Sequence, residues 1–333
     1  MASPVLKTYW HLACERQRIY FRRLTREAPP WSQDPVLQKY RFTNAFRAAD
    51  QVSQNLIRVI YEGSQKPEDL VFRTLLFRFF NKPSTWRSLE SMTGGVTWRK
   101  FDLETYSDLL DRMLAQGERI YSAAYIVPPP PMGAVRKHRN HLLLIQHMMK
   151  SKIVPNIEKS KSLGGVYEVL RAYPSLGPFL SYQLTVDMNY STLIDFDEND
   201  FTVAGPGARS GIAKCFLDTG GLSDEDIIRW MTESQNEQVE NFAFNLLTLF
   251  GRDLKLIDCQ NLFCETDKYA RVAHPDVNGV GNRTRIKQQF NPISSPERPF
   301  FPPKWKINQF TLDQEPPREV AHPEEQSTKR ISA

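Results

Sequence analysis

Residues 173–214 read YPSLGPFLSYQLTVDMNYSTLIDFDENDFTVAGPGARSGIAK, and two Gly/Pro turns within this stretch each lead directly into an apolar helical pattern. In the first turn, Gly177 and Pro178 separate a helix that ends near Tyr173 from a helix that begins at Pro178. Proline suits the first helical position, and glycine can adopt the positive φ that such a joint often needs. The pattern predicts a helix-hairpin-helix motif, whose backbone N–H groups can hold a DNA phosphate.

The second turn, AGPGARSG at residues 204–211, opens another helix. Gly205 and Gly207 would let the backbone approach a ligand closely, and Arg209 would offer its guanidinium group to a phosphate. A Gly/Pro turn between helices also occurs for structural reasons alone. Two such turns about thirty residues apart, in a basic chain, favour an anion-binding surface.

Upstream of these turns, residues 41–60 show the clearest amphipathic helix pattern of the chain. One face is apolar, and the opposite face carries six amide or arginine side chains: Asn44, Arg47, Gln51, Gln54, Asn55 and Arg58. Amide and guanidinium groups read base edges and phosphates in nucleic acids. A solvated helix face more often carries lysine and glutamate, so this face is either a nucleic-acid contact or an unusual solvated surface.

Helical periodicity recurs along most of the chain and strand patterns are rare, which predicts an all-α, multi-helical fold. Further helices are expected at residues 8–24, from Pro35, and at residues 70–80, 101–125, 138–149, 162–173, 227–233, 238–249 and 258–272. Residues 1–290 are expected to form one helical domain. Residues 291–333 contain eight of the 23 prolines, which predicts a tail extended along the surface as far as Phe310 and disordered beyond it.

The composition is that of a globular, mildly basic protein: 333 residues, 41% hydrophobic, with a net charge of +5. Residues 1–60 carry ten Lys/Arg against four acids, and arginine dominates, as suits phosphate recognition. The four cysteines form no CxxC pair and no histidine lies at zinc-finger spacing, which argues against a structural zinc or iron–sulfur site. The sequence has no signal segment or membrane-spanning stretch, so we expect an intracellular, reducing compartment, without secretion.

Several blocks of sequence resemble one known family. They are WHLACER at residues 10–16, Arg22-Arg23, PWSQD at 30–34, RFTNAFRAAD at 41–50, Phe72-Arg73, FNK at 80–82, Ala124-Tyr125, GPFL at 177–180, Gln183, Asp187, GPGA at 205–208 and CETDKY at 264–269. Together they resemble the helical domain found with 5-hydroxymethyluracil DNA kinases, also described as the α-glutamyl/putrescinyl thymine pyrophosphorylase family. The resemblance covers about residues 8–275 and implies a helix-hairpin-helix, DNA-glycosylase-like fold.

The resemblance also implies a role in thymine hypermodification. A kinase makes a diphosphate on the 5-hydroxymethyl group of a uracil in DNA, and this domain, acting as a transferase, replaces that diphosphate with an amine nucleophile. The sequence contains no GxxxxGK[ST] motif, so the implied partners are DNA, an amine co-substrate and a separate P-loop DNA-base kinase. Mg²⁺ can assist with a diphosphate, although no metal-ligand spacing argues for it.

Site residues follow from this chemistry. The base must be flipped into a pocket, and cationic or N–H groups must meet the charge of the leaving diphosphate. The expected substrate- and DNA-binding residues are Arg16, Asn44, Arg47, Gly177, Gly205, Gly207 and Arg209. The expected catalytic residues are Glu15, Asp187, Glu265 and Lys268, one carboxylate acting as general base. We expect Asn44, Arg47, Gly207 and Lys268 to converge on one electropositive cleft.

Each carboxylate also has a structural alternative. Glu15 can pair with Arg18 or Arg22, Asp187 can cap a turn, and Glu265 can pair with Lys268. Two other functions also stand beside the transferase: a helix-hairpin-helix glycosylase-like hydrolase, and a non-catalytic DNA-binding module that partners a DNA-base kinase. Glycosylases of this kind carry a catalytic Asp about twenty residues after the hairpin, where the Gly-rich turn lies here, and this counts against base excision.

Overall fold

The computed structural model describes residues 1–123, 127–281, 283–292 and 297–313. Within these ranges the regular secondary structure is helical, accompanied by isolated β-bridges such as that between Ala2 and Phe216. The predicted all-α class is therefore confirmed. Ala124 and Tyr125, which contributed to the family resemblance, lie outside the described residues.

The helices follow one another with short connections. They are α1 (Pro4–Leu24), α2 (Pro35–Lys39), η1 (Arg47–Ala49), α3 (Gln51–Tyr61), α4 (Pro67–Phe80), α5 (Pro83–Thr93), η2 (Trp98–Lys100), α6 (Leu103–Ala115), α7 (Lys137–Lys150), α8 (Ile153–Lys159), α9 (Leu163–Arg171), α10 (Pro178–Asn189), α11 (Pro206–Cys215), α12 (Asp224–Glu233), α13 (Gln235–Asn241), α14 (Leu256–Ala273), η3 (Pro303–Trp305) and α15 (Phe310–Asp313).

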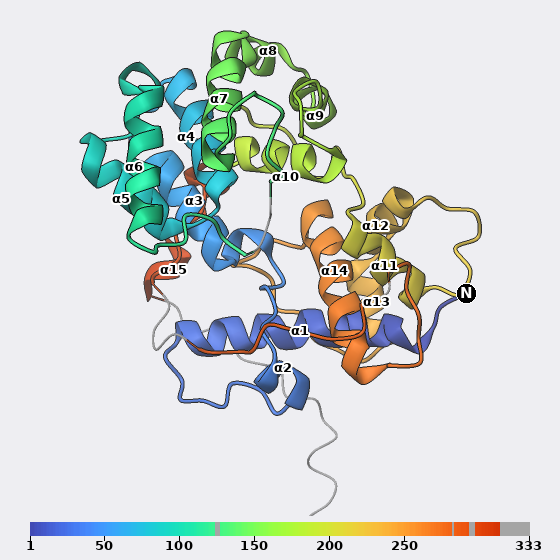
Figure 1. Cartoon of the computed structure of the whole chain (residues 1–333). Coiled ribbons are helices and arrows are strands. Elements are labelled where there is room, and N and C mark those ends of the chain that lie inside the picture. The colour runs from blue at the N-terminus through green and yellow to red at the C-terminus, as the bar shows by residue number, and fades with distance from the viewer. Residues whose placement is uncertain (124–126, 282, 293–296, 314–333) are drawn as a thin grey trace, which may run out of the picture.

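The helices form two groups, which α1 joins (Figure 1). Helices α3 to α10 make up one group, in which α4 packs against α3, α7 and α10. Helices α11 to α14 make up the other, and α14 contacts α1, α11 and α12. The C-terminal end of α1 extends beneath the first group, so that its last turns lie near α3.

Side-chain caps and prolines decide where several helices begin. Proline occupies the first turn of α1, α2, α4, α5, α10 and α11, where its missing N–H costs no hydrogen bond. Asp34 caps α2 by accepting from the backbone N–H groups of Val36 and Leu37. Ser223 and Asp226 form a reciprocal capping box on α12. Such a cap stabilises a helix by roughly 1 kcal/mol.

The predicted helix over residues 41–60 begins ten residues later than expected. Asp50 caps α3 by accepting from the N–H of Val52, and Arg47 lies in the preceding 3₁₀ turn. The backbone N–H of Arg47 donates to Asp258 (2.6 Å), a contact that helical residues at this point would lose. Residues 41–46 are therefore not helical, although Ala45 and Phe46 are buried as their apolar pattern predicted.

Two other predicted helices end early. The helix expected over residues 101–125 stops at Ala115, followed by Gly117 with φ 79°. The helix expected over residues 238–249 is instead α13, which ends at Asn241, before Ala243 with φ 54°. Helices α5 and α8 were not predicted. Both are short amphipathic segments beside turns, which a periodicity argument resolves poorly.

The C-terminal segment departs from its predicted surface path. Phe301 is fully buried, and η3 and α15 form where an extended chain was expected. Lys304 donates to the carbonyl oxygens of Ser191 (3.1 Å) and Ile194 (2.7 Å), which fixes this segment to the residues after α10. The domain boundary at residue 290 stays a prediction, and residues 314–333 lie outside the described chain.

Candidate functional site

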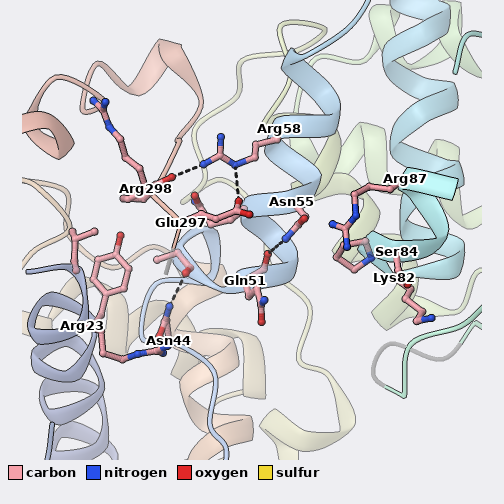
Figure 2. A pocket seen from close by; sticks show the side chains of 16 residues that line it. Arg23, Asn44, Gln51, Asn55, Arg58, Lys82, Ser84, Arg87, Glu297 and Arg298 are labelled. Carbon is pink, nitrogen blue, oxygen red and sulfur yellow. Dashed lines mark hydrogen bonds and ion pairs between the residues drawn. The ribbon is translucent and has the colours of Figure 1, made fainter. Parts of the chain in front are cut away.

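A cavity of about 530 Å³ lies between the end of α1, the exposed side of α3, the start of α5 and residues 297–299 (Figure 2). Its volume is within the range of small-molecule sites, which is roughly 300–1,000 Å³. Its wall carries five cations, four amides and one carboxylate: Arg23, Arg58, Lys82, Arg87 and Arg298, then Asn44, Gln51, Gln54 and Asn55, then Glu297. We call it the α3 cavity.

The amides of α3 face this cavity because the opposite side of the helix is buried. Leu56, Ile57 and Ile60 are fully buried on that side. Gln54 is held at both ends of its amide, since it donates to the carbonyl of Ala48 (2.7 Å) and accepts from the N–H of Phe300 (2.7 Å). Of the amide and arginine face predicted within residues 41–60, all members but Arg47 line this ligand-sized cavity.

Two more amides are positioned by backbone contacts. The side-chain nitrogen of Asn55 donates to the carbonyl of Gln51 (2.8 Å), and that of Asn44 donates to the carbonyl of Ala49 (2.6 Å), as Figure 2 shows. These contacts restrict the rotamers of both side chains before any ligand binds.

The cations of the cavity differ in how many contacts they make with other protein groups. Arg58 donates to the carbonyl of Arg298 and lies 3.8 Å from the carboxylate of Glu297 (Figure 2). Lys82 donates to the carbonyl of Arg119. Arg87 is exposed and forms no ion pair within the described residues, so its guanidinium group is available to an anion.

Two side chains from α1 add to the wall. Burial lowers the pKa of Arg23, whose guanidinium group lies over the ring of Trp31, 5.2 Å from its centre. The hydroxyl of Tyr20 is buried and has no hydrogen-bond partner in the described part of the chain. Burial raises the pKa of this hydroxyl, which therefore stays protonated and can donate to a ligand.

Behind Asn44 lies a buried network that holds four of the sequence-predicted residues together. Arg16 donates to the carbonyl of Thr43 (2.9 Å) and to the side-chain oxygen of Asn44 (2.7 Å). Glu265 accepts from the N–H of Thr43 (2.9 Å) and from Lys268 (2.8 Å). Burial lowers the pKa of Arg16 to about 10, and nearby Glu265 opposes this shift.

Asp187 lies in a different buried cluster. Its carboxylate accepts from Arg47 (2.8 Å) and twice from Arg78 (2.6 and 2.7 Å), and its side chain is fully buried. Arg47 also donates to Gln183 (3.0 Å) and Tyr190 (3.0 Å). The cluster fixes α10 to α4 and η1, and its two predicted site residues, Asp187 and Arg47, do not line the α3 cavity.

The glycines after the hairpin pack against protein. A Cβ at Gly207 would lie 2.3 Å from Cys264 Sγ, and one at Gly205 would lie 2.6 Å from the ring of Phe179. The close approach expected toward a ligand is thus an approach of α11 to α14 at Gly207. Arg209 is half exposed, donates to the carbonyl of Ala204 (3.2 Å) and lies 3.6 Å from Asp224.

A turn between α9 and α10 lies at the predicted residues, but its conformation differs from the one expected, and the helix-hairpin-helix motif itself stays a prediction. Gly177 precedes α10 with φ −68°, and the positive φ falls on Ser175 instead, at 63°. Whether the backbone N–H groups of this turn bind DNA stays a prediction.

The remaining carboxylate, Glu15, accepts from Ser32 (2.6 Å) and lies 3.4 Å from Arg18. Its structural alternative and that of Glu265, a pair with Lys268, are both present in the structure. The predicted convergence of four residues on one cleft is wrong. Asn44 lines the α3 cavity, whereas Arg47 lies in the Asp187 cluster, Gly207 packs on α14 and Lys268 pairs with Glu265.

Sequence reasoning missed the other walls of the cavity. Lys82 immediately precedes the unpredicted helix α5, and Arg87 lies within it. Glu297 and Arg298 come from the segment that was predicted to be a surface tail. Within the described ranges, no group of three His, Cys, Asp or Glu side chains is arranged to hold a metal ion. In the same ranges, no helix combines the length and apolarity needed to cross a bilayer.

Comparison with known proteins identifies the family. The model of the family "5-hmdU DNA kinase, helical domain" matches residues 3–279. The chain belongs to this family. A 5-hmdU DNA kinase of Bacillus phage SP10 is 26% identical over 278 residues, which are 77% of this chain and 43% of the relative. The chain thus spans less than half the length of that relative, and no solved structure matches it.

Proposed function

We propose that this chain modifies 5-hydroxymethyluracil in DNA, and that it replaces the diphosphate of 5-(diphosphooxymethyl)uracil with an amine. The observation that carries the proposal is the α3 cavity, in a member of the 5-hmdU DNA kinase helical-domain family. Its excess of cations suits an anionic substituent, and its amides suit the polar edge of a pyrimidine. A base in a duplex reaches such a cavity only when it is flipped out of the stack.

Each wall of the cavity has a part in this reaction. Asn44, Gln51 and Asn55 contact the base, and Arg58 and Arg87 hold the diphosphate, whose negative charge grows as it leaves. Glu297 is the carboxylate among the lining residues, and it accepts the proton of the attacking amine. The bond between carbon and amine nitrogen forms as the bond between carbon and the diphosphate oxygen breaks.

The predicted residues behind the cavity act through Asn44. Arg16, Glu265 and Lys268 position the segment that carries Asn44, and they do so without contacting the substrate. The diphosphate is supplied by a P-loop DNA-base kinase. Any Mg²⁺ that takes part is bound by the diphosphate of the substrate.

A direct assay uses DNA that bears 5-(diphosphooxymethyl)uracil together with putrescine as the amine. Pyrophosphate is measured in solution, and the nucleosides are identified by mass spectrometry after digestion. Pyrophosphate with an aminated thymine nucleoside is the expected result. Abasic sites would indicate a glycosylase instead. Arg87→Ala should lower turnover about 10- to 100-fold, since a hydrogen bond to a charged group contributes about 1.5–3 kcal/mol.

A second candidate function is a non-catalytic DNA-binding module that presents DNA to the kinase. It is favoured by the engagement of Glu15, Asp187 and Glu265 in contacts within the protein, away from the α3 cavity. In the same assay this module would bind the DNA in a salt-sensitive way and release no pyrophosphate.

A further inference from the structure

A second cavity, of about 600 Å³, lies between the end of α6, residues 118–121 and the start of α7. Arg119, Arg136 and Lys137 line it, opposed by the single carboxylate of Glu118. Arg136 is two-thirds exposed and lies 3.6 Å from the carboxylate of Asp111, whereas Arg119 is exposed without an ion pair in the described part of the chain. We call it the α7 cavity.

The two cavities meet at Lys82. This lysine lines the α3 cavity and donates to the carbonyl of Arg119, which lines the α7 cavity. The border is held by two further contacts: Thr85 donates to the carbonyl of Ile120 (3.0 Å), and the N–H of Ser122 donates to the carbonyl of Phe80 (3.0 Å). These contacts hold the walls of the two cavities next to each other, and we call the cations that line both cavities the cation band.

Positive charge is concentrated in this band. Five cations and one carboxylate line the α3 cavity, and three cations and one carboxylate line the α7 cavity, an excess of six positive charges. The whole sequence has a net charge of only +5. The first turn of α7 contains no acidic residue, so the positive end of its helix dipole adds to the field there.

We infer that the α7 cavity holds backbone phosphates of the DNA strand next to the nucleotide bound in the α3 cavity. This inference rests on the proposed function, because it extends the same DNA from one cavity into the next. Two neighbouring groups of cations, with an arginine in each cavity that has no ion pair among the described residues (Arg87 and Arg119), fit the repeated charge of a polynucleotide. Phosphate contacts of this kind set register and affinity and leave base recognition to the first cavity.

The test measures binding of a fluorescein-labelled DNA duplex with one 5-(diphosphooxymethyl)uracil, without an amine, by anisotropy over a series of salt concentrations. The double variant Arg119→Ala/Arg136→Ala is compared with wild type, with Arg87→Ala and with Lys7→Ala. Lys7 is an exposed cation on the same helix as Arg23 but sixteen residues away, about 24 Å at 1.5 Å per residue. Melting followed by circular dichroism confirms that each variant is folded.

The double variant should bind more weakly and should lower the slope of log K against log salt by about 1.8, or about 0.9 for each lost phosphate contact. A double variant that binds like Lys7→Ala, while Arg87→Ala binds more weakly, overturns the inference and leaves the proposed function standing. If Arg87→Ala also binds like wild type, the proposed function fails as well.

Discussion

Replacing Asp187 by asparagine separates a structural role from a catalytic one. The carboxylate compensates two buried guanidinium groups through three hydrogen bonds of 2.6–2.8 Å. Asparagine removes the negative charge. It also replaces one carboxylate oxygen by an NH₂ group, which is a donor and would face an arginine N–H. Breaking a buried ion pair from one side costs about 3–5 kcal/mol. At roughly 2–4 °C per kcal/mol for a chain of this size, the melting temperature should fall by about 10 °C.

The assay is thermal unfolding followed by circular dichroism, with Asp195→Asn as the matched control. Asp195 lies 3.1 Å from Lys304, but its side chain is 80% exposed, and such a pair contributes about 1 kcal/mol or less. Turnover and DNA binding are then measured well below the lower melting temperature, where Asp187→Asn should retain both. An Asp187→Asn protein that melts like the control but has lost turnover would refute the structural account and restore Asp187 as a catalytic residue.

Three further predictions concern the packing of α11 on α14, the protonation of His141 and the positioning of Asn44. Gly211→Ala should destabilise the protein by about 1–3 kcal/mol or more in urea unfolding, because its Cβ would lie 2.0 Å from the carbonyl of Phe263. Burial lowers the pKa of His141 from its ordinary 6.5 to about 4, so the unfolded chain binds more protons between these values. Stability should therefore fall by about 3 kcal/mol as the pH drops from 6.5 to 4, and His141→Gln should flatten this dependence. Arg16→Lys should weaken DNA binding about tenfold with little loss of fold, because lysine cannot hold Thr43 and Asn44 together.

Two of these predictions have a control variant within the chain. Gly165→Ala places its Cβ at an ordinary 3.4 Å from Ser160, so it should be nearly neutral where Gly211→Ala is not. His147→Gln is the control for protonation, since His147 is exposed on the same helix as His141. If Arg16→Lys left DNA affinity unchanged, Asn44 would not depend on the network behind it.

Local sequence signals predicted the helices well where a proline or cap coincided with apolar periodicity. Helices α10 and α11 begin at Pro178 and Pro206, as the two turns predicted. The same signals failed for residues 41–46, because Ala45 and Phe46 are buried by tertiary contacts in a segment that is not helical. Periodicity alone cannot tell these two ways of burying a side chain apart.

The site was predictable only on one wall. The polar face of α3 is a local pattern, and the order of residues along the chain is enough to identify Gln51, Gln54, Asn55 and Arg58. The opposite walls come from residues 82–87 and 297–299, and only the tertiary fold brings them to α3. The Asp187 cluster also depends on the tertiary fold, since the two arginines that contact Asp187 are 109 and 140 residues away from it in the sequence. The glycines at residues 205–211 pack closely against neighbouring side chains and backbone, and sequence alone does not separate this use from close approach to a ligand, because both select the same residue.

The central claim is tested most directly by locating the 5-position of the target base in the complex with DNA. DNA with 5-iodouracil at the target position places a photoreactive atom where the modified group is attached, and the cross-linked peptide is identified by mass spectrometry. We predict adducts in the α3 cavity, on Tyr20 or on the peptide of residues 48–58. Adducts confined to residues 173–190 or 204–215, around the hairpin and the start of α11, would contradict the account.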